Sequence, residues 1–136
     1  MEWKEALPLL QENHTAVAVS VTPKGRAQAT IVSTAVLDGK VGFATRPRTV
    51  KAKNIERTGR ATVTVIKLDS RRFVTVEGPA SIEPWQDTKA HIKRLKDLYV
   101  SMARAPKGTD EEFAKQMRDE DRSLILVTPE RLYGSL

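Results

Sequence analysis

The sequence contains no cysteine, which excludes disulfides, thiol catalysis, iron–sulfur clusters and thiolate zinc sites together. It contains only two histidines, so a metal site would need carboxylates to complete it. The acidic residues of segment 111–121 are interpreted as helix caps and a solvated helix face. We therefore expect no metal.

Long hydrophobic runs are also missing. No apolar stretch approaches the roughly 20 residues that span a bilayer, and the segment Met1 to Leu10 shows no secretory pattern. We expect a cytoplasmic protein that makes no contact with a membrane.

The composition is that of a folded chain with a basic surplus. With 136 residues, 40% hydrophobic and 29% charged, the sequence predicts a single globular domain over 1–136. Lysine and arginine exceed aspartate and glutamate by 23 to 17, a formal charge of +6. This surplus indicates an acidic partner and leaves nucleic acid, membrane and phosphorylated small molecules as alternatives.

The periodicity predicts mostly strands. Alternating or β-branched runs, separated by turns such as Asp38-Gly39 and by a bend at Gly78-Pro79, lie at 16–21, 29–37, 40–45, 60–67, 73–82 and 124–127. Helical spacing lies at 3–10, 50–57 and 86–104, and a capping box opens another helix at Thr109. We expect a β-rich α+β fold in which six or so mostly antiparallel strands close as a small barrel with short helices.

Much of the positive charge lies in the segment Arg46 to Arg60, which holds six basic residues against one acid. Thr49 is the predicted N-cap of a helix whose first turn contains Lys51, and free backbone N–H groups at a helix start favour anions. A phosphate site and a merely solvated basic face are both open. The segment has no aromatic residue, which counts against binding of single-stranded nucleic acid.

Three consecutive blocks carry a family resemblance: residues 25–32 (GRAQATIV), 38–45 (DGKVGFAT) and 49–61 (TVKAKNIERTGRA). In order and spacing they resemble the split β-barrel flavin-binding family of pyridoxamine 5′-phosphate oxidase and its relatives that use the deazaflavin coenzyme F-420. Residues 128–134 (TPERLYG) resemble the closing strand of the deazaflavin branch.

The resemblance implies a cofactor site between two subunits of a homodimer. The second strand would line the flavin-type ring, the end of the third strand would lie near the ribityl chain, and Lys51 would hold the phosphate with Arg48 or Thr49 as helper. Asn54 completes a Lys-x-x-Asn pattern of the deazaflavin branch. The implied cofactor-binding residues are Thr30, Ile31, Val32, Ser33, Ala44, Thr45, Arg48, Thr49, Lys51 and Asn54.

Two departures shape the expected activity. Val50 stands where pyridoxamine phosphate oxidases carry an arginine, and their longer C-terminal segment with substrate-binding His and Arg residues is not matched, so vitamin B6 oxidation is not expected. The basic surplus suits the acidic oligoglutamate tail of F-420. We expect a reductase that transfers hydride from reduced F-420 to a small organic substrate. The alternative is an FMN-binding protein, either a flavin oxidoreductase or a non-catalytic carrier.

No protein group is assigned to catalysis, because hydride chemistry belongs to the cofactor. His14 and His91 are interpreted as surface or structural residues. Trp85 either stacks on a ring in the partner subunit's site or anchors a helix on the barrel. A helical stripe is interpreted as core or dimer packing: Ile92, Leu95, Tyr99 and Met102. The loop 103–109 is expected at the open face of the cofactor groove.

Overall fold

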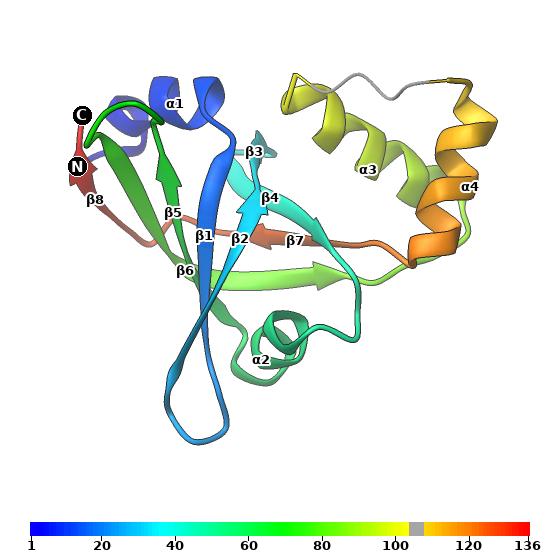
Figure 1. Cartoon of the computed structure of the whole chain (residues 1–136), viewed down its shortest axis with the longest axis horizontal. Helices are drawn as coiled ribbons and strands as arrows, with labels where there is room; N and C mark the ends of the chain where they lie inside the picture. Colours follow the sequence, from blue (N-terminus) through cyan, green and yellow to red (C-terminus); the bar gives the residue numbers. More distant parts are fainter. Residues whose placement is uncertain (104–107) are drawn as a thin grey trace.

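In the computed structural model, which describes residues 1–103 and 108–136, four helices surround one antiparallel sheet of eight strands (Figure 1). The strands are β1 (Thr15–Val21), β2 (Ala27–Ser33), β3 (Ala35–Leu37), β4 (Lys40–Thr45), β5 (Arg60–Ile66), β6 (Phe73–Glu83), β7 (Ser123–Val127) and β8 (Arg131–Ser135). The helices are α1 (Trp3–Glu12), α2 (Val50–Thr58), α3 (Lys89–Ser101) and α4 (Asp110–Glu120). The prediction of a β-rich α+β fold is confirmed, and the sheet has eight strands where six or so were expected.

The strand order β2-β1-β5-β6-β7-β4-β3 explains how the sheet curls. Its two ends, β2 and β3, are consecutive in the chain. The sequence suggested one run over 29–37, but the structure breaks it at Thr34, whose N–H donates to the carbonyl of His14 at 2.8 Å. The chain therefore leaves β1 after Ser33 and begins a new pairing with β4 at Ala35, which turns the sheet into a half-barrel.

The predicted interruption at Gly78-Pro79 lies within one continuous strand, at the point where β6 stops pairing with β5 and β8 and begins to pair with β7. β6 pairs with β5 from Phe73 to Pro79 and with β7 from Ala80 onward. A Cβ added at Gly78 would lie 1.8 Å from the carbonyl oxygen of Thr128. Only glycine lets the two backbones approach this closely at the corner of the sheet.

The predicted turns and caps are confirmed. Asp38 and Gly39 both have positive φ, 56° and 69°, as a two-residue hairpin between β3 and β4 requires. The Thr49 hydroxyl caps α2, Gly59 ends it with φ 67°, and Thr109 forms a capping box at α4. The predicted helix 86–104 begins later, at Lys89, and ends at Ser101. Of the predicted loop 103–109, residues 104–107 lie outside the described residues.

Two hydrophobic clusters fill the molecule, and β7 lies between them. The sheet core, which includes Phe43 and Val63, lies under α1 and α2, and the helical core, which includes Leu98 and Met117, lies under α3 and α4. All of β7 is buried, and its alternate residues divide between the two: Ile125 faces the sheet core and its neighbours face the helical core. No helix in the described ranges has the length and apolar content to cross a bilayer.

Candidate functional site

A hollow of about 230 Å³ lies where the sheet half and the helical half meet. Its lining comes from β2, β4, α2, the C-terminal end of α3 and the residue before β7. The lining residues are Ile31, Val32, Ser33, Ala44, Lys51, Tyr99, Met102 and Arg122. The structure thus brings together residues of the predicted cofactor set from three separate blocks of sequence. It adds three residues from the helical half that sequence reasoning did not assign to the site.

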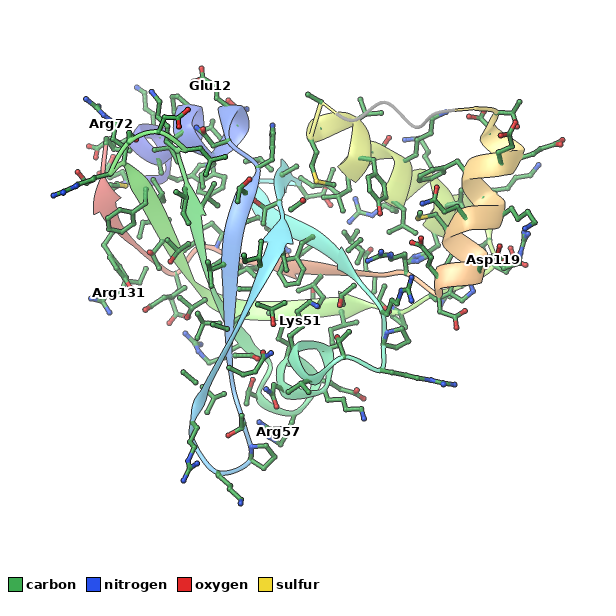
Figure 2. The ribbon with its side chains drawn as sticks, in the orientation of Figure 1. Glu12, Lys51, Arg57, Arg72, Asp119 and Arg131 are labelled. Atoms are coloured by element: carbon green, nitrogen blue, oxygen red, sulfur yellow. The ribbon has the colours of Figure 1, made fainter. Side chains whose placement is uncertain are left out.

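Lys51 is the first cation of the hollow. It lies in the first turn of α2, is half-buried, and occupies the middle of the molecule near β2 (Figure 2). Its ammonium has no hydrogen-bond or ion-pair partner within residues 1–103 and 108–136. Burial and, secondly, the positive charge of Arg122 lower the pKa of Lys51. A half-buried cation without a counter-charge is suited to bind an anion from solution.

Arg122 is the second cation, and neighbouring side chains hold it in place. Its Nε donates to the Glu120 carboxylate at 2.7 Å, and its backbone carbonyl lies 2.9 Å from Nε2 of His91. Burial raises the pKa of Glu120, but hydrogen bonds from Arg122 and Gln116 outweigh it and the pKa falls below its usual value. Glu120 is therefore a charged, half-buried partner of Arg122 rather than the expected solvated-face residue.

Three predicted residues lie beside the hollow rather than in its lining. The hydroxyl of Thr45, which is buried, lies 3.1 Å from that of Thr49, and Thr49 also donates to the carbonyl of Arg46 at 3.0 Å. These bonds fix the start of α2 and so the position of Lys51. Thr30 lies on β2 and accepts a hydrogen bond from Gln28 at 2.8 Å.

The other two, Asn54 and Arg48, differ sharply. Asn54 is buried, donates to the hydroxyl of Ser20 at 3.1 Å and accepts from Arg57 at 3.1 Å, so it ties α2 to β1. Arg48 is exposed in the turn before α2. Arg57 also donates to the carbonyl of Val21 beside the hairpin between β1 and β2 (Figure 2), so part of the basic segment is bound away from the hollow.

A family model for pyridoxamine 5′-phosphate oxidase matches residues 3–135. The chain belongs to the pyridoxamine 5′-phosphate oxidase family. The predicted membership is confirmed, and the match includes both the strand blocks around the hollow and the helical half. No curated protein matches the chain.

Solved structures confirm the split-barrel fold of this family. A conserved hypothetical protein of Mycobacterium tuberculosis superposes with a TM-score of 0.80 at 20% identity, covering 99% of this chain and 84% of that one. An F420 reductase gives 0.68 at 23% identity, covering 93% and 94%. A pyridoxamine 5′-phosphate oxidase-related, FMN-binding protein of Nostoc punctiforme gives 0.68 at 15%, covering 97% and 83%. At these identities the likeness concerns the fold.

Tyr99 and Met102 were predicted as packing residues, and within this family member they both pack and face the hollow. Met102 is buried in the helical core, and the Tyr99 ring meets Phe113 edge-on at 5.6 Å. Trp85 contacts His91 edge-on at 5.3 Å beside the same core, which favours its anchoring role. His91 is buried against the Arg122 carbonyl and so has the structural role predicted for it.

The sequence carried one signal for the sites it missed. Tyr99 and Met102 are the last two residues of the apolar stripe of α3. If that stripe had been placed beside β2, both residues would have been predicted to line the site. Arg122 has no such signal, because it stands alone between α4 and β7 with no motif around it. Its place in the hollow follows only from the pairing of β7 with β4, which sets Ser123 opposite Thr45.

The hollow combines an open strand edge, an apolar side chain and two cations. β2 is at the end of the strand order, so within the described residues its outer backbone edge is unpaired and can bond a ring with polar edges. The Ile31 side chain, 76% exposed, offers an apolar surface beside it. Lys51 and Arg122 provide positive charge in the lining of the same space.

Proposed function

We propose that this protein is an oxidoreductase that uses reduced coenzyme F-420, bound in the hollow, to reduce a small organic substrate. The observation that carries the proposal is Lys51, a half-buried ammonium without a partner in the described residues, beside the exposed edge strand β2. A cofactor with a ring and a phosphate matches both features at once.

In the proposed complex the backbone of residues 30–33 faces the ring, and Ala44 and Thr45 lie near the polyol chain. Lys51 binds the phosphate, and the positive end of the α2 dipole supports it. When bound, the reduced deazaflavin supplies the hydride. The protein's part is to bind the phosphate, to orient the ring on β2, and to exclude water with Tyr99 and Met102, which line the same hollow.

Exposed charge favours F-420 over FMN as the cofactor. Arg46, Arg48 and Lys53 lie around the start of α2 and are open to solvent, where an acidic oligoglutamate tail would extend from the phosphate. The fold shared with an F420 reductase supports this choice. FMN is the second candidate, supported by the fold shared with an FMN-binding protein.

We also propose that a second copy of the chain completes the site. One face of the β1–β2 pair is apolar and open: Val17, Val19, Val21, Ala27, Ala29 and Ile31. Their cross-strand pairing places them together, and Ile31 belongs both to this face and to the hollow. At about 230 Å³ the hollow is smaller than the roughly 300–1,000 Å³ of typical ligand sites, as expected of half a site.

The cofactor is tested by titrating the purified protein with F-420 and FMN side by side, following fluorescence. Tighter binding of F-420 supports the proposal, tighter binding of FMN replaces it with the flavin alternative, and binding of neither refutes both. Sedimentation tests the second copy: we expect a dimer for the natural protein and a monomer for Val19→Glu, which changes the apolar face outside the hollow. A monomeric natural protein would contradict the shared site.

A further inference from the structure

We propose that Arg122 binds the same anionic group as Lys51, so that one phosphate is held between cations from the two halves of the molecule, and that Glu120 positions Arg122 for this task. The proposal rests on the proposed function for the identity of the ligand. The paired anion site itself can be tested without any cofactor.

Lys51 and Arg122 contribute two positive charges to the same hollow. Lys51 and Arg122 both line the hollow and both are half-buried. The Arg122 charge acts on Lys51 strongly enough to lower its pKa in addition to the effect of burial. Without a ligand the two like charges repel, and an anion between them replaces that repulsion with two attractions.

The guanidinium of Arg122 is fixed at one edge and available at the other. Its Nε is committed to Glu120 at 2.7 Å, and Glu120 is itself held by Gln116, whose Nε2 donates at 3.3 Å. The terminal amino groups of Arg122 have no partner among the residues that the structure describes. A planar guanidinium held in this way presents two donors in a defined direction, the geometry that phosphate oxygens accept.

The backbone around Arg122 is held as well. Its carbonyl lies 2.9 Å from Nε2 of buried His91 on α3, and β7 begins at the next residue, where Ser123 pairs with Thr45 of β4. Thr45 in turn contacts Thr49 at the start of α2. Both cations therefore stand on one continuous hydrogen-bonded framework, although they lie far apart in sequence.

Few other charges reach this point. Tyr99 of α3 is the remaining titratable side chain of the hollow among the described residues. Glu120 at the end of α4 neutralises part of Arg122, and Arg46 before α2 acts on Glu120. On α2 itself, Lys53 is exposed, and Arg48 is exposed in the turn before it. Lys51 and Arg122 thus leave a net positive hollow with one negative residue beside it.

The first experiment uses inorganic phosphate as the probe and measures the pKa of Lys51 by NMR of the labelled lysine side chains, assigned with Lys51→Gln. Removing the neighbouring charge in Arg122→Gln should raise the pKa of Lys51 toward its ordinary value. Phosphate should raise it in the natural protein and less in Arg122→Gln. An unchanged pKa in Arg122→Gln, or an equal response to phosphate in both proteins, would overturn the proposal.

The second experiment compares the binding affinity of FMN with that of riboflavin, which lacks the phosphate, and also measures the affinity for F-420. Arg122→Gln should weaken binding of the phosphorylated cofactor at least about tenfold, as expected for a charge-assisted contact, and leave riboflavin unchanged. The matched control is Arg118→Gln, an exposed arginine paired with Asp87 outside the hollow. An equal loss for riboflavin would show a structural effect and refute the anion contact.

Glu120 is tested as a positioning residue by its conservative variant. In Glu120→Gln the amide oxygen can still accept from Arg122 Nε, so we expect binding of the phosphorylated cofactor to be retained, whereas Glu120→Ala should weaken it. Equal losses in both variants would remove Glu120 from the proposal. If the natural protein binds neither cofactor while phosphate still shifts Lys51 through Arg122, the proposed function fails and the paired site stands.

Discussion

The sheet half and the helical half of this molecule are built differently. In the sheet half, hydrogen-bonded ladders join β2, β1, β5 and β6 in unbroken register around the sheet core. In its described residues the helical half has no ladder of its own: α3 and α4 pack on β3 and β7 through the helical core, with exposed ion pairs such as Arg118–Asp87 at the surface. Rigid ladders and packed helices meet at the hollow.

This contrast separates the half that fixes the proposed site from the half that adjusts it. β2, β4 and α2 bring Ile31, Ala44 and Lys51 from the sheet half, and α3 and the residue before β7 bring Tyr99 and Arg122 from the other. Exposed ion pairs contribute little to stability, so the helical half depends on the packing of its own core. We therefore expect the sheet half to set the cofactor position and the helical half to complete the site around it.

The largest expected effect separates the two cores. Phe43→Ala and Phe113→Ala each remove a buried ring, from the sheet core and the helical core respectively. We expect Phe43→Ala to lower the free energy of global unfolding by about 3–5 kcal/mol, so that hydrogen exchange becomes faster in both halves. Phe113→Ala should mainly expose the amides of α3 and α4 to hydrogen exchange. Uniform exchange in both variants would show that the halves unfold as one.

The next effect tests the sheet half of the hollow. Lys51→Ala should weaken binding of F-420 or FMN more than about tenfold, because a charge-assisted phosphate contact is lost, with little change in the melting temperature. The control is Lys53→Ala on the same helix, which is exposed and should change the binding of FMN, which has no acidic tail, only slightly. Binding should also weaken as salt rises. Salt-independent binding would indicate that contacts with the ring, rather than charge, supply most of the affinity.

A smaller effect is expected from changes at the N-caps of α2 and α4, which lie in the sheet half and the helical half respectively. Thr49→Ala removes the hydroxyl that accepts from the Ala52 N–H, and Thr109→Ala removes the equivalent bond at α4. Each should cost about 1 kcal/mol of stability. Only Thr49→Ala should also weaken cofactor binding, since Thr49 fixes the turn that carries Lys51. Thr49→Ser is the rescue, and equal cofactor affinities in both alanine variants would contradict the division of roles.

The smallest effect concerns the surface of the helical half. The hydrogen bond from Arg118 lowers the pKa of Asp87, and this outweighs the opposing effect of burial. A carboxyl with a lowered pKa in the folded state stabilises it above its ordinary pKa of 3.8, and this is lost as pH falls below that value. Asp87→Asn should therefore lower the melting temperature slightly at neutral pH and not in acid. A difference that persists in acid would contradict this origin.

Local chemistry explains what the sequence could predict. Asp38-Gly39, the Thr49 cap and the Thr109 capping box act within a few residues, so each could be located from its neighbours alone. The family blocks added Lys51 and the edge strand β2. The break at Thr34 could not be predicted from the sequence, because a β-branched residue also favours a strand. The break depends on a contact with His14, which lies twenty residues away in the chain.

The features that could not be predicted depend on contacts between residues far apart in the sequence. Asn54 fits the family pattern, but its side chain turns inward to Ser20, a choice set by the packing of α2 on β1. Arg122 meets Lys51 only after β7 has paired with β4, and no local pattern encodes that pairing. Residue type thus predicted an anion site, and the topology brings Lys51 and Arg122, the two cations proposed for it, into the same hollow.

We expect the pairing of β4 with β7 also to govern how fast the chain folds. The hairpin of β3 and β4 joins residues that are close in the sequence. The other edge of β4 pairs with the distant strand β7, for example Val41 with Val127. Closing such a long loop slows folding, and an open strand edge invites association with another chain in the meantime. The rate-limiting event of folding is expected to be the arrival of β7, which completes the barrel wall and creates the hollow in one step.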